Sequence, residues 1–299
     1  MRNFHDLIKA RWAEGKFVCV GLDPDMDRMP EHLKERCRSA ELPVHRPDPS
    51  TVVEFCESII AATKDLVCAY KPNSAFFEGL GHSGIEALLE VIGTAHQLAP
   101  HVPVILDAKR ADIDNTNKGY IKSAFDLLGA DAITVHPYLG KQALQPFLAR
   151  KEKGIIVLCR TSNKGAGEFQ DIRVQTVGSE PGSIVSAKLY EIVAAQVAHE
   201  WNANGNCALV VGATYPAELA RVRQIVGELP ILIPGIGVQG GDLEKTVAAG
   251  KDSRGRGMII NSSRSILYAS SGEDYAEAAR RETLKLHKAI KSCLEEVTV

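Results

Sequence analysis

The chain has 299 residues, of which 45% are hydrophobic and 24% charged, enough for one large α/β barrel or two ordinary domains. A formal net charge of −2 argues against general attraction to nucleic acid or an anionic membrane, so any phosphate needs a local site. Seven scattered cysteines without a Cys-x-x-Cys pair argue against a disulfide framework or a zinc site.

Eight short apolar runs recur along the chain, separated by longer stretches with the pattern of helices. Because these runs are almost continuously apolar, we expect strands buried on both faces, and the spacers are typical of parallel crossovers. Eight β-α units in a chain of this length predict a (β/α)8 TIM barrel, with residues 1–299 as a single α/β domain. The expected strands are 17–22, 67–70, 102–106, 132–135, 154–158, 208–211, 231–233 and 258–260.

The spacers 84–92 and 186–197 are amphipathic, and we expect helices there. A doubly wound open sheet is the structural alternative, but no Gly-x-Gly-x-x-Gly follows the first strand. Two stretches, 24–50 and 161–182, have no regular pattern, and loops of this length are uncommon unless they are functional. The second would lie on the active-site face of a barrel, as a lid or as a tolerated surface insertion.

Nothing in the sequence indicates a targeting or membrane segment. The first residues lead directly into an amphipathic stretch without a signal-peptide core, and no apolar run approaches membrane-spanning length. The nine histidines show no His-Glu-x-x-His or similar ligand spacing, so we expect no metal. Together with the cysteine pattern, these features predict a cytoplasmic protein.

Charged side chains follow the predicted strands at the end where a TIM barrel places its active site. The first strand is followed by Asp23, the second by Lys71, and the third by Asp107 and Lys109. Asp107 and Lys109 are two residues apart, so they should share one face of their strand. An isolated buried charge is costly, whereas alternating signs can stay ionised together. The pattern therefore favours a catalytic site over its structural alternative, a strand-end salt bridge with Asp112 as a helix cap.

The loops after the last two strands have the composition of a phosphate site. The seventh strand runs into Pro-Gly-Ile-Gly-Val-Gln-Gly-Gly-Asp at 234–242, and the eighth into Asn-Ser-Ser-Arg at 261–264. Glycine lets backbone amides approach an anion closely, and a guanidinium can bind phosphate oxygens in a bidentate manner. These loops are the usual phosphate site of the barrel, so we expect a phosphorylated small molecule as ligand.

The motifs together resemble the orotidine 5′-phosphate decarboxylase family, and more closely its longer bacterial branch. The resemblance covers the chain from Asp23 to about Tyr268. It implies conversion of orotidine 5′-monophosphate to uridine 5′-monophosphate (UMP) and CO2, the last step of de novo pyrimidine biosynthesis, without a cofactor. It rests on Asp107-x-Lys109-x-x-Asp112-Ile113 with Thr116 following, on Tyr70-Lys-Pro-Asn73, on residues 234–241 and on Asn261-Ser-Ser-Arg264, in the expected order.

The resemblance also implies roles for single residues. Lys109 would stabilise a carbanion at C6 of the pyrimidine and then protonate it. Asp112 and Ile113 would be supplied by the other subunit of a homodimer. The implied catalytic residues are Lys71, Asp107, Lys109 and Asp112. The implied substrate-binding residues are Asp23 and Thr116 at the ribose, Ile113, Ser162 at the pyrimidine with Thr161 and Asn163 as alternatives, and Pro234, Gln239, Gly240 and Arg264, of which Gln239 and Arg264 bind the phosphate.

Three other functions are compatible with parts of the pattern. A sugar-phosphate aldolase would use Lys71 or Lys109 as a Schiff-base nucleophile, although neighbouring carboxylates keep an amine protonated. A metal-dependent hexulose-phosphate synthase or pentulose-phosphate epimerase would share the barrel and an Asp-x-Lys segment. A non-catalytic nucleotide-binding barrel would bind UMP without turnover. It would leave the four charged residues Lys71, Asp107, Lys109 and Asp112 without an obvious use.

Overall fold

The computed structural model describes residues 2–36, 48–177, 184–236 and 242–295. Eight parallel strands form one sheet in the order β2-β1-β10-β9-β8-β5-β4-β3, so neighbours in the sheet are successive barrel strands in the chain. Two further bridges, Tyr70 with Val104 and Asn73 with Asp107, connect the β2 edge with the β3 edge and complete the ring. The predicted TIM barrel is confirmed. The strands are β1 Val18–Leu22, β2 Val67–Pro72, β3 Ile105–Arg110, β4 Ala132–Val135, β5 Gly154–Arg160, β8 Cys207–Val211, β9 Ile231–Pro234 and β10 Met258–Ser262.

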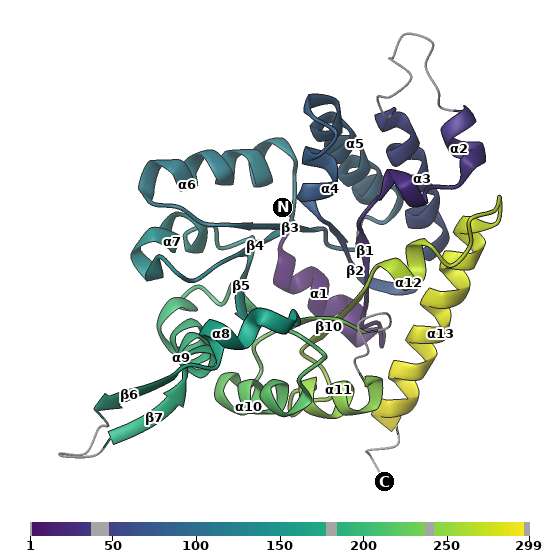
Figure 1. The fold of residues 1–299 in the computed structure, drawn as a ribbon. Helices are drawn as coiled ribbons and strands as arrows, with labels where there is room; N and C mark the ends of the chain where they lie inside the picture. Colours follow the sequence, from purple (N-terminus) through teal and green to yellow (C-terminus); the bar gives the residue numbers. More distant parts are fainter. Residues whose placement is uncertain (1, 37–47, 178–183, 237–241, 296–299) are drawn as a thin grey trace.

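Helices surround the ring on its outside, as the crossovers between parallel strands require (Figure 1). None of the helices in the described ranges combines the length and apolar character needed to cross a membrane. The helices are α1 Phe4–Ala13, α2 Glu31–Arg36, α3 Pro49–Thr63, α4 Ser74–Glu78, α5 His82–Leu98, α6 Asp114–Ile121, α7 Gly140–Leu148, α8 Gly167–Gln170, α9 Leu189–Ala195, α10 Pro216–Val226, α11 Leu243–Gly250, α12 Arg264–Leu267 and α13 Tyr275–Glu295. Helical turns of other kinds are Met26–Arg28, Lys122–Leu127, Lys164–Ala166 and Gln196–Trp201.

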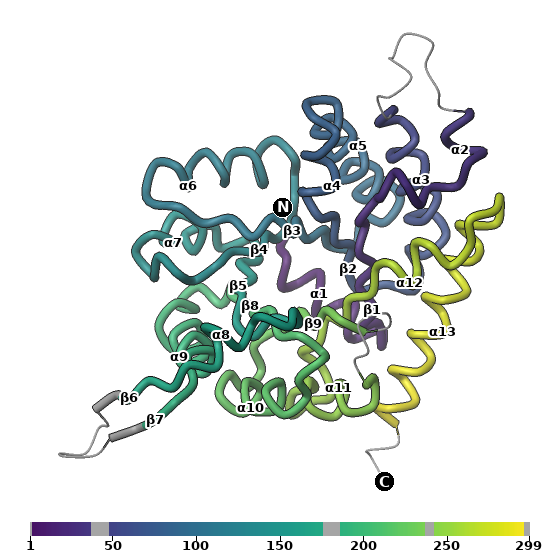
Figure 2. Tube along the Cα trace, in the orientation of Figure 1, coloured from purple at the N-terminus to yellow at the C-terminus, as the bar shows by residue number. Residues whose placement is uncertain are grey.

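The first helix, α1, closes the end of the barrel where the strands begin. The indole nitrogen of Trp12 donates to the carbonyl of Met258, 2.7 Å away, and Arg11 Nε donates to the carbonyl of Val67 at 3.0 Å. Met258 and Val67 are the first residues of β10 and β2. In the Cα trace α1 accordingly crosses the centre of the ring (Figure 2). A ligand can therefore enter the barrel only at the opposite end, where the strands finish.

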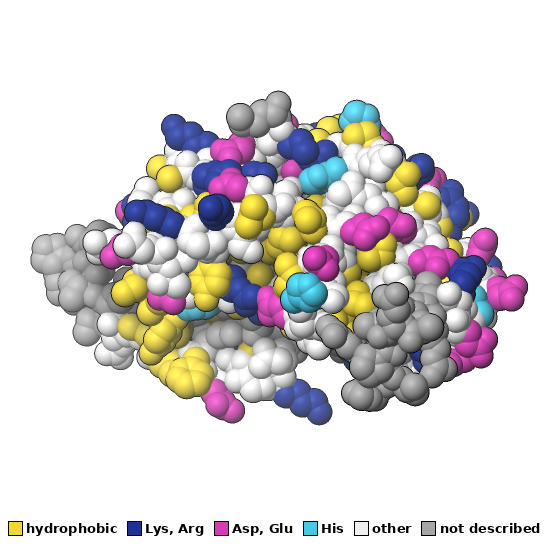
Figure 3. Space-filling model, turned by 90° about the horizontal axis from the view of Figure 1, so that it is seen from above, with side chains coloured by type: hydrophobic (Ala, Val, Ile, Leu, Met, Phe, Trp, Pro, Cys, Tyr) yellow, Lys and Arg dark blue, Asp and Glu magenta, His cyan; other side chains and the backbone are white. Residues whose placement is uncertain are grey.

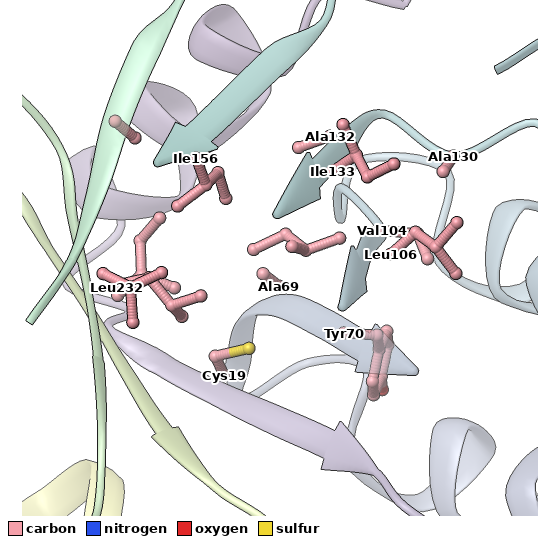
Figure 4. Packing of buried hydrophobic residues seen from close by; sticks show 14 of the residues in the cluster. Cys19, Ala69, Tyr70, Val104, Leu106, Ala130, Ala132, Ile133, Ile156 and Leu232 are labelled. Atoms are coloured by element: carbon pink, nitrogen blue, oxygen red, sulfur yellow. The ribbon is translucent and has the colours of Figure 1, made fainter. Parts of the chain in front are cut away.

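The barrel strands are buried on both faces, as their continuous apolar runs predict. Every residue of β1, β2, β4, β8 and β10 is buried. Side chains from different strands meet in this core, among them Cys19 of β1, Ala69 of β2, Ile156 of β5 and Leu232 of β9 (Figure 4). Each fully buried aliphatic side chain contributes about 1.5–3 kcal/mol, so the core fixes the ring on which the strand-end residues sit.

Two details differ from the sequence prediction. The strand expected at 102–106 begins at Ile105 and continues through Arg110, because its pairing with β4 starts at Ile105 and ends at Arg110. The helix expected at 186–197 begins only at Leu189. Residues 186–188 belong instead to a strand, in which Lys188 pairs with Arg173. The Lys188 amide also donates to the Glu191 carboxylate at 2.7 Å, which fixes the start of the helix.

The two stretches without a regular pattern contain structure that sequence periodicity did not show. In the second, an antiparallel pair of strands, β6 (Arg173–Val177) and β7 (Ile184–Lys188), projects away from the barrel beside α9 (Figure 1). In the first, a short 3-10 turn at Met26–Arg28 is followed by α2, and residues 37–47 lie outside the described part of the chain. Both insertions lie outside the ring, which is why they leave the barrel order intact.

One buried carboxylate, that of Asp131, connects Arg2 to the closed end of the barrel, where the strands begin. Asp131, only 1% exposed, accepts hydrogen bonds from Arg2 at 2.8 and 2.9 Å and from the amide of Val104 at 2.9 Å. His96 Nε2 lies 3.3 Å from the same carboxylate. Burial alone would raise the pKa of Asp131, but His96, Arg2 and the Val104 amide together lower it to about 2.

We predict that Asp131→Asn destabilises the fold by roughly 2 kcal/mol at neutral pH. Because the pKa of Asp131 is lower in the folded than in the unfolded chain, its stabilisation is complete above about pH 4 and is lost as the pH falls towards 2. Urea unfolding of both proteins from pH 7 down to pH 3 should show the wild-type advantage shrinking below about pH 4. The exposed pair of Asp126 with Arg150 provides a control, Asp126→Asn, which should change stability little. A constant difference at every pH would contradict the assignment.

Candidate active site

A cavity opens at the end of the barrel where the strands finish. Its walls come from strand ends that are far apart in the sequence but adjacent in the ring, which is the position of active sites in TIM barrels. The lining residues are Asp23, Lys71, Asn73 and Asp107 on one side, and 234–236 and 261–265 on the other.

Three of the sequence-predicted catalytic residues form one charged cluster beside this cavity. The carboxylate of Asp107 accepts a hydrogen bond from Lys71 Nζ at 2.9 Å through one oxygen and from Lys109 Nζ at 2.7 Å through the other. The side chain of Lys71 is only 5% exposed and that of Asp107 12%, whereas Lys109 is 50% exposed and reaches towards solvent. The expected sharing of one face by Asp107 and Lys109 is confirmed.

The cluster keeps Asp107 and Lys71 ionised. Burial alone would raise the pKa of Asp107, but the ammonium groups of Lys71 and Lys109 outweigh it and hold that pKa well below its usual range. Burial alone would lower the pKa of Lys71, but Asp107 and Asp23 outweigh it and hold that pKa above its usual range. A lysine held protonated in this way is a poor Schiff-base nucleophile, which counts against an aldolase.

Two buried oxygens in the cavity wall have no hydrogen-bond donor among the described residues. They are Oδ1 of Asp23 and Oδ1 of Asn261. A buried acceptor without a donor is costly in a finished structure, and it is common where a ligand supplies the missing donor. Both oxygens are therefore candidates for binding hydroxyl or N–H groups of a ligand.

The predicted phosphate side of the site is present in part. Pro234 lines the cavity, and so does the exposed Arg264, whose guanidinium forms no ion pair with any side chain in the described ranges. Arg264 lies at the start of α12, directly after β10. Gln239 and Gly240 lie outside the described residues. The free guanidinium beside the cavity remains available for an anion.

The fourth predicted catalytic residue does not join the cluster within one chain. Asp112 is not among the residues that line the cavity, and its carboxylate accepts from the amide of Ile113 at 2.6 Å. Its own amide donates to the side chain of Asn117 at 2.8 Å. Ile113 is 59% exposed and Thr116 is also exposed. Asp112 does not cap α6 either, because the residue before that helix is Ile113. Ile113 and Thr116 are thus exposed, while Asp112 is half-buried outside the cavity.

The loop after β5 is anchored by side chains that the sequence reading did not single out. Arg160 donates to Asp171 at 3.1 Å, and Gln170 accepts from the amide of Thr161 at 2.9 Å. The hydroxyl of Thr161 is bonded to Asn163 at 2.7 Å within the same loop. The Ser162 hydroxyl has no such bond to a described residue. Of the three residues proposed to contact the pyrimidine, Ser162 is thus the one with a free side chain.

Sequence reasoning missed some residues of the site. Asn73 and Asn261 line the cavity, and both lie inside motifs that were already recognised, so their position after strand ends was an available signal. Thr134 donates to Asp107 at 2.9 Å from the neighbouring strand β4. A single hydroxyl inside the apolar run 132–135 was its only signal.

Comparison with known proteins bears on this geometry. Residues 16–281 match the model of the orotidine 5′-phosphate decarboxylase / HUMPS family. The chain belongs to this family. It is 49% identical over 292 residues to the orotidine 5′-phosphate decarboxylase of Azoarcus sp. (strain BH72), covering 97% of this chain and 99% of the relative. The same named enzyme of Dechloromonas aromatica (strain RCB) is 47% identical over 289 residues, which cover 96% and 98% of the two chains.

Two solved structures are also similar to this chain. The OMP decarboxylase of Leishmania donovani has a TM-score of 0.75 and 39% identity, covering 95% of this chain and 98% of that one. The UMP synthase of Leishmania donovani has a TM-score of 0.81 and 40% identity, and the match covers 98% of this chain but 56% of that longer chain.

The loop after β5 depends on close approach at Gly212, just beyond β8. The Gly212 amide donates to the Arg160 carbonyl at 2.8 Å, and a Cβ at this position would lie 2.8 Å from the Cα of Ser162. We predict that Gly212→Ala destabilises the protein by about 1–3 kcal/mol and speeds amide exchange in residues 161–171. The matched control is Gly93→Ala in α5, where a Cβ meets nothing within 4 Å. Thermal unfolding and hydrogen exchange of the two variants test this, and equal behaviour would refute the packing argument.

Proposed function

We propose that the Lys71, Asp107 and Lys109 cluster at the open end of this barrel decarboxylates orotidine 5′-monophosphate to UMP and CO2, the last step of de novo pyrimidine biosynthesis. The observation that carries this function is the buried carboxylate of Asp107, which lines the cavity together with Lys71 and is held between two ammonium groups, one of them half exposed. Relatives named as this carboxy-lyase align with nearly the whole of the chain.

The decarboxylation requires a positive charge held close to C6 of the pyrimidine. When the bond from C6 to the carboxylate breaks, its electron pair stays on a ring carbon, and a neighbouring cation is needed to stabilise it. Lys109 supplies that cation and then transfers a proton from Nζ to C6. Asp107 would face the substrate carboxylate, and like-charge repulsion at ~4 Å and an effective dielectric near 20 amounts to about 4 kcal/mol, relieved as CO2 leaves. Lys71 holds Asp107 ionised in its buried position.

Substrate binding follows from the cavity wall. Asp23, whose buried Oδ1 lacks a donor among the described residues, would accept from a ribose hydroxyl. Arg264, assisted by Gln239, Gly240 and Pro234, would bind the phosphate and hold the ring in place from a distance. Ser162 would contact the pyrimidine.

A homodimer would complete the site. Asp112, Ile113 and Thr116 do not line the cavity of their own chain, so we expect them to enter that of a second copy. Hydrophobic side chains lie exposed on the face that carries α4, α5 and α6 (Figure 3). Ile85 and Leu89 of α5 are 40% and 49% exposed. An apolar face of this kind supports an interface between two copies.

We also place the enzyme in the cytoplasm. Cys19, Cys56, Cys68, Cys159 and Cys207 are buried free thiols. Free buried thiols are typical of reducing compartments.

The loss of absorbance of orotidine 5′-monophosphate tests the function directly, and the rate should not change when a chelator is added. We predict that Lys109→Ala lowers kcat at least about 10³-fold while thermal unfolding stays close to that of the wild type. Lys285→Ala, which removes an exposed lysine from α13, is the control and should leave kcat unchanged. A wild type without turnover, or a folded Lys109→Ala variant that keeps much of its rate, would overturn the proposal.

Mixed dimers test the shared site. Homodimers of Lys109→Ala or of Asp112→Ala should both be nearly inactive. When the two variants are refolded together, one site of each mixed dimer carries both defects, but the other pairs an intact Lys109 with an intact Asp112 from the second chain. Mixing should therefore restore activity, up to about a quarter of the wild-type rate per subunit if chains pair at random and the two sites act independently. Subunit exchange is confirmed with a tag, and no gain on mixing would show that Asp112 serves its own chain.

A further inference from the structure

The pairing between β3 and β4 is interrupted at the catalytic cluster. Leu106 of β3 pairs with Ile133 of β4, and the next pair is Arg110 with Val135. Three residues of β3, 107–109, therefore lie opposite the single residue Thr134. Such an insertion in one strand leaves backbone groups without their ladder partners and redirects the side chains.

The backbone at this point is also in an unusual conformation. Lys109 has a φ of 47°, in the left-handed region that residues other than glycine rarely adopt. Such a conformation costs about 1 kcal/mol or more and persists where surrounding contacts hold it. A specific contact is therefore needed at the residue that carries the half-exposed ammonium group.

The hydroxyl of Thr134 provides that contact. Its oxygen accepts hydrogen bonds from the amides of Ala108 and Lys109, both at 3.0 Å. The same hydroxyl donates its proton to Oδ1 of Asp107 at 2.9 Å. Thr134 is only 1% exposed, so no water can easily replace it. One buried group thus satisfies two amides of the irregular segment and orients the carboxylate beside it.

Lys109 Nζ donates to the same oxygen of Asp107, Oδ1, at a distance of 2.7 Å. Lys71 bonds the other oxygen. Thr134 therefore fixes both the backbone from which Lys109 extends and the carboxylate oxygen against which its ammonium group rests. Thr134 does not line the cavity.

We propose that Thr134 is a positioning residue for the decarboxylation: its hydroxyl holds Asp107 and Lys109 in the arrangement that the reaction requires, without touching the substrate. The inference rests on the function proposed above, because it assigns Lys109 to the reacting carbon. Misplacement of a reacting group by about 1 Å can cost about 10²-fold in rate.

The test compares Thr134→Val, which keeps the shape and deletes the hydroxyl, with Thr134→Ser, which keeps the hydroxyl. The valine variant should lose about 10²-fold in kcat while its KM and its affinity for UMP change less than about threefold, because the phosphate contacts lie across the cavity. Thr134→Ser should retain kcat within a few-fold of the wild type. Amide exchange in a peptide spanning 105–112 should be faster in the valine variant.

The control is Thr283→Val in α13, which deletes another buried threonine hydroxyl, bonded there to the carbonyl of Ala279 at 2.7 Å. It should lower stability without changing kcat. If Thr134→Val does not fold, Thr134→Ala deletes the same hydroxyl with less bulk. The inference is overturned if the hydroxyl-free variant keeps kcat within threefold, or if serine loses as much as valine. An inactive wild type would instead refute the proposed function, and the exchange measurement would still report whether Thr134 holds the segment.

Discussion

The ion pairing of Asp107 is the constraint on which the site depends. A carboxylate with 12% of its side chain exposed is unstable as an anion unless cations and hydrogen-bond donors surround it, and here Lys71 and Lys109 supply the charge. The pairing with Asp107 explains why Lys71 can be buried at a strand end. Removal of Asp107 would leave the buried ammonium group of Lys71 without its closest counter-ion, so these two residues depend on each other. The barrel contributes the rigid strand ends that keep these three side chains within hydrogen-bond distance.

The two ends of the barrel use buried charge differently. At the closed end, Asp131 is surrounded by fixed partners, and Arg223 donates to the backbone carbonyls of Gly227, Leu229, Gly250 and Gly257. There, burial outweighs the nearby carboxylates of Asp252 and Glu228 and lowers the pKa of Arg223 to about 10. At the open end, Asp23 and Asn261 each keep an acceptor without a donor among the described residues. Both residues line the cavity, so a ligand that enters it can supply the missing donors.

Much of this arrangement could be predicted from the sequence, because the decisive signals were local. The eight apolar runs identified the strands, and charges at their ends identified Asp23, Lys71, Asp107 and Lys109 before any geometry was known. The role of Thr134 could not be predicted, since it arises from an interruption in strand pairing that has no sequence periodicity. The predicted start of α9 was also wrong. Residues 186–188 pair with β6, and strand pairing of this kind overrides helical propensity. Asp112 does not cap α6, but its role in the site of a second chain stays a prediction.

Because α1 closes one end of the barrel, the cavity opens only at the other end. Trp12 and Arg11 of α1 are bonded to the first residues of β10 and β2, so no passage leads through the barrel to the far side. The substrate and both products must therefore travel by the same route, in opposite directions. If Arg264 binds the phosphate as proposed, the nucleotide product held there excludes the next substrate molecule until it leaves. Competition between product and substrate would then follow from the geometry of the barrel.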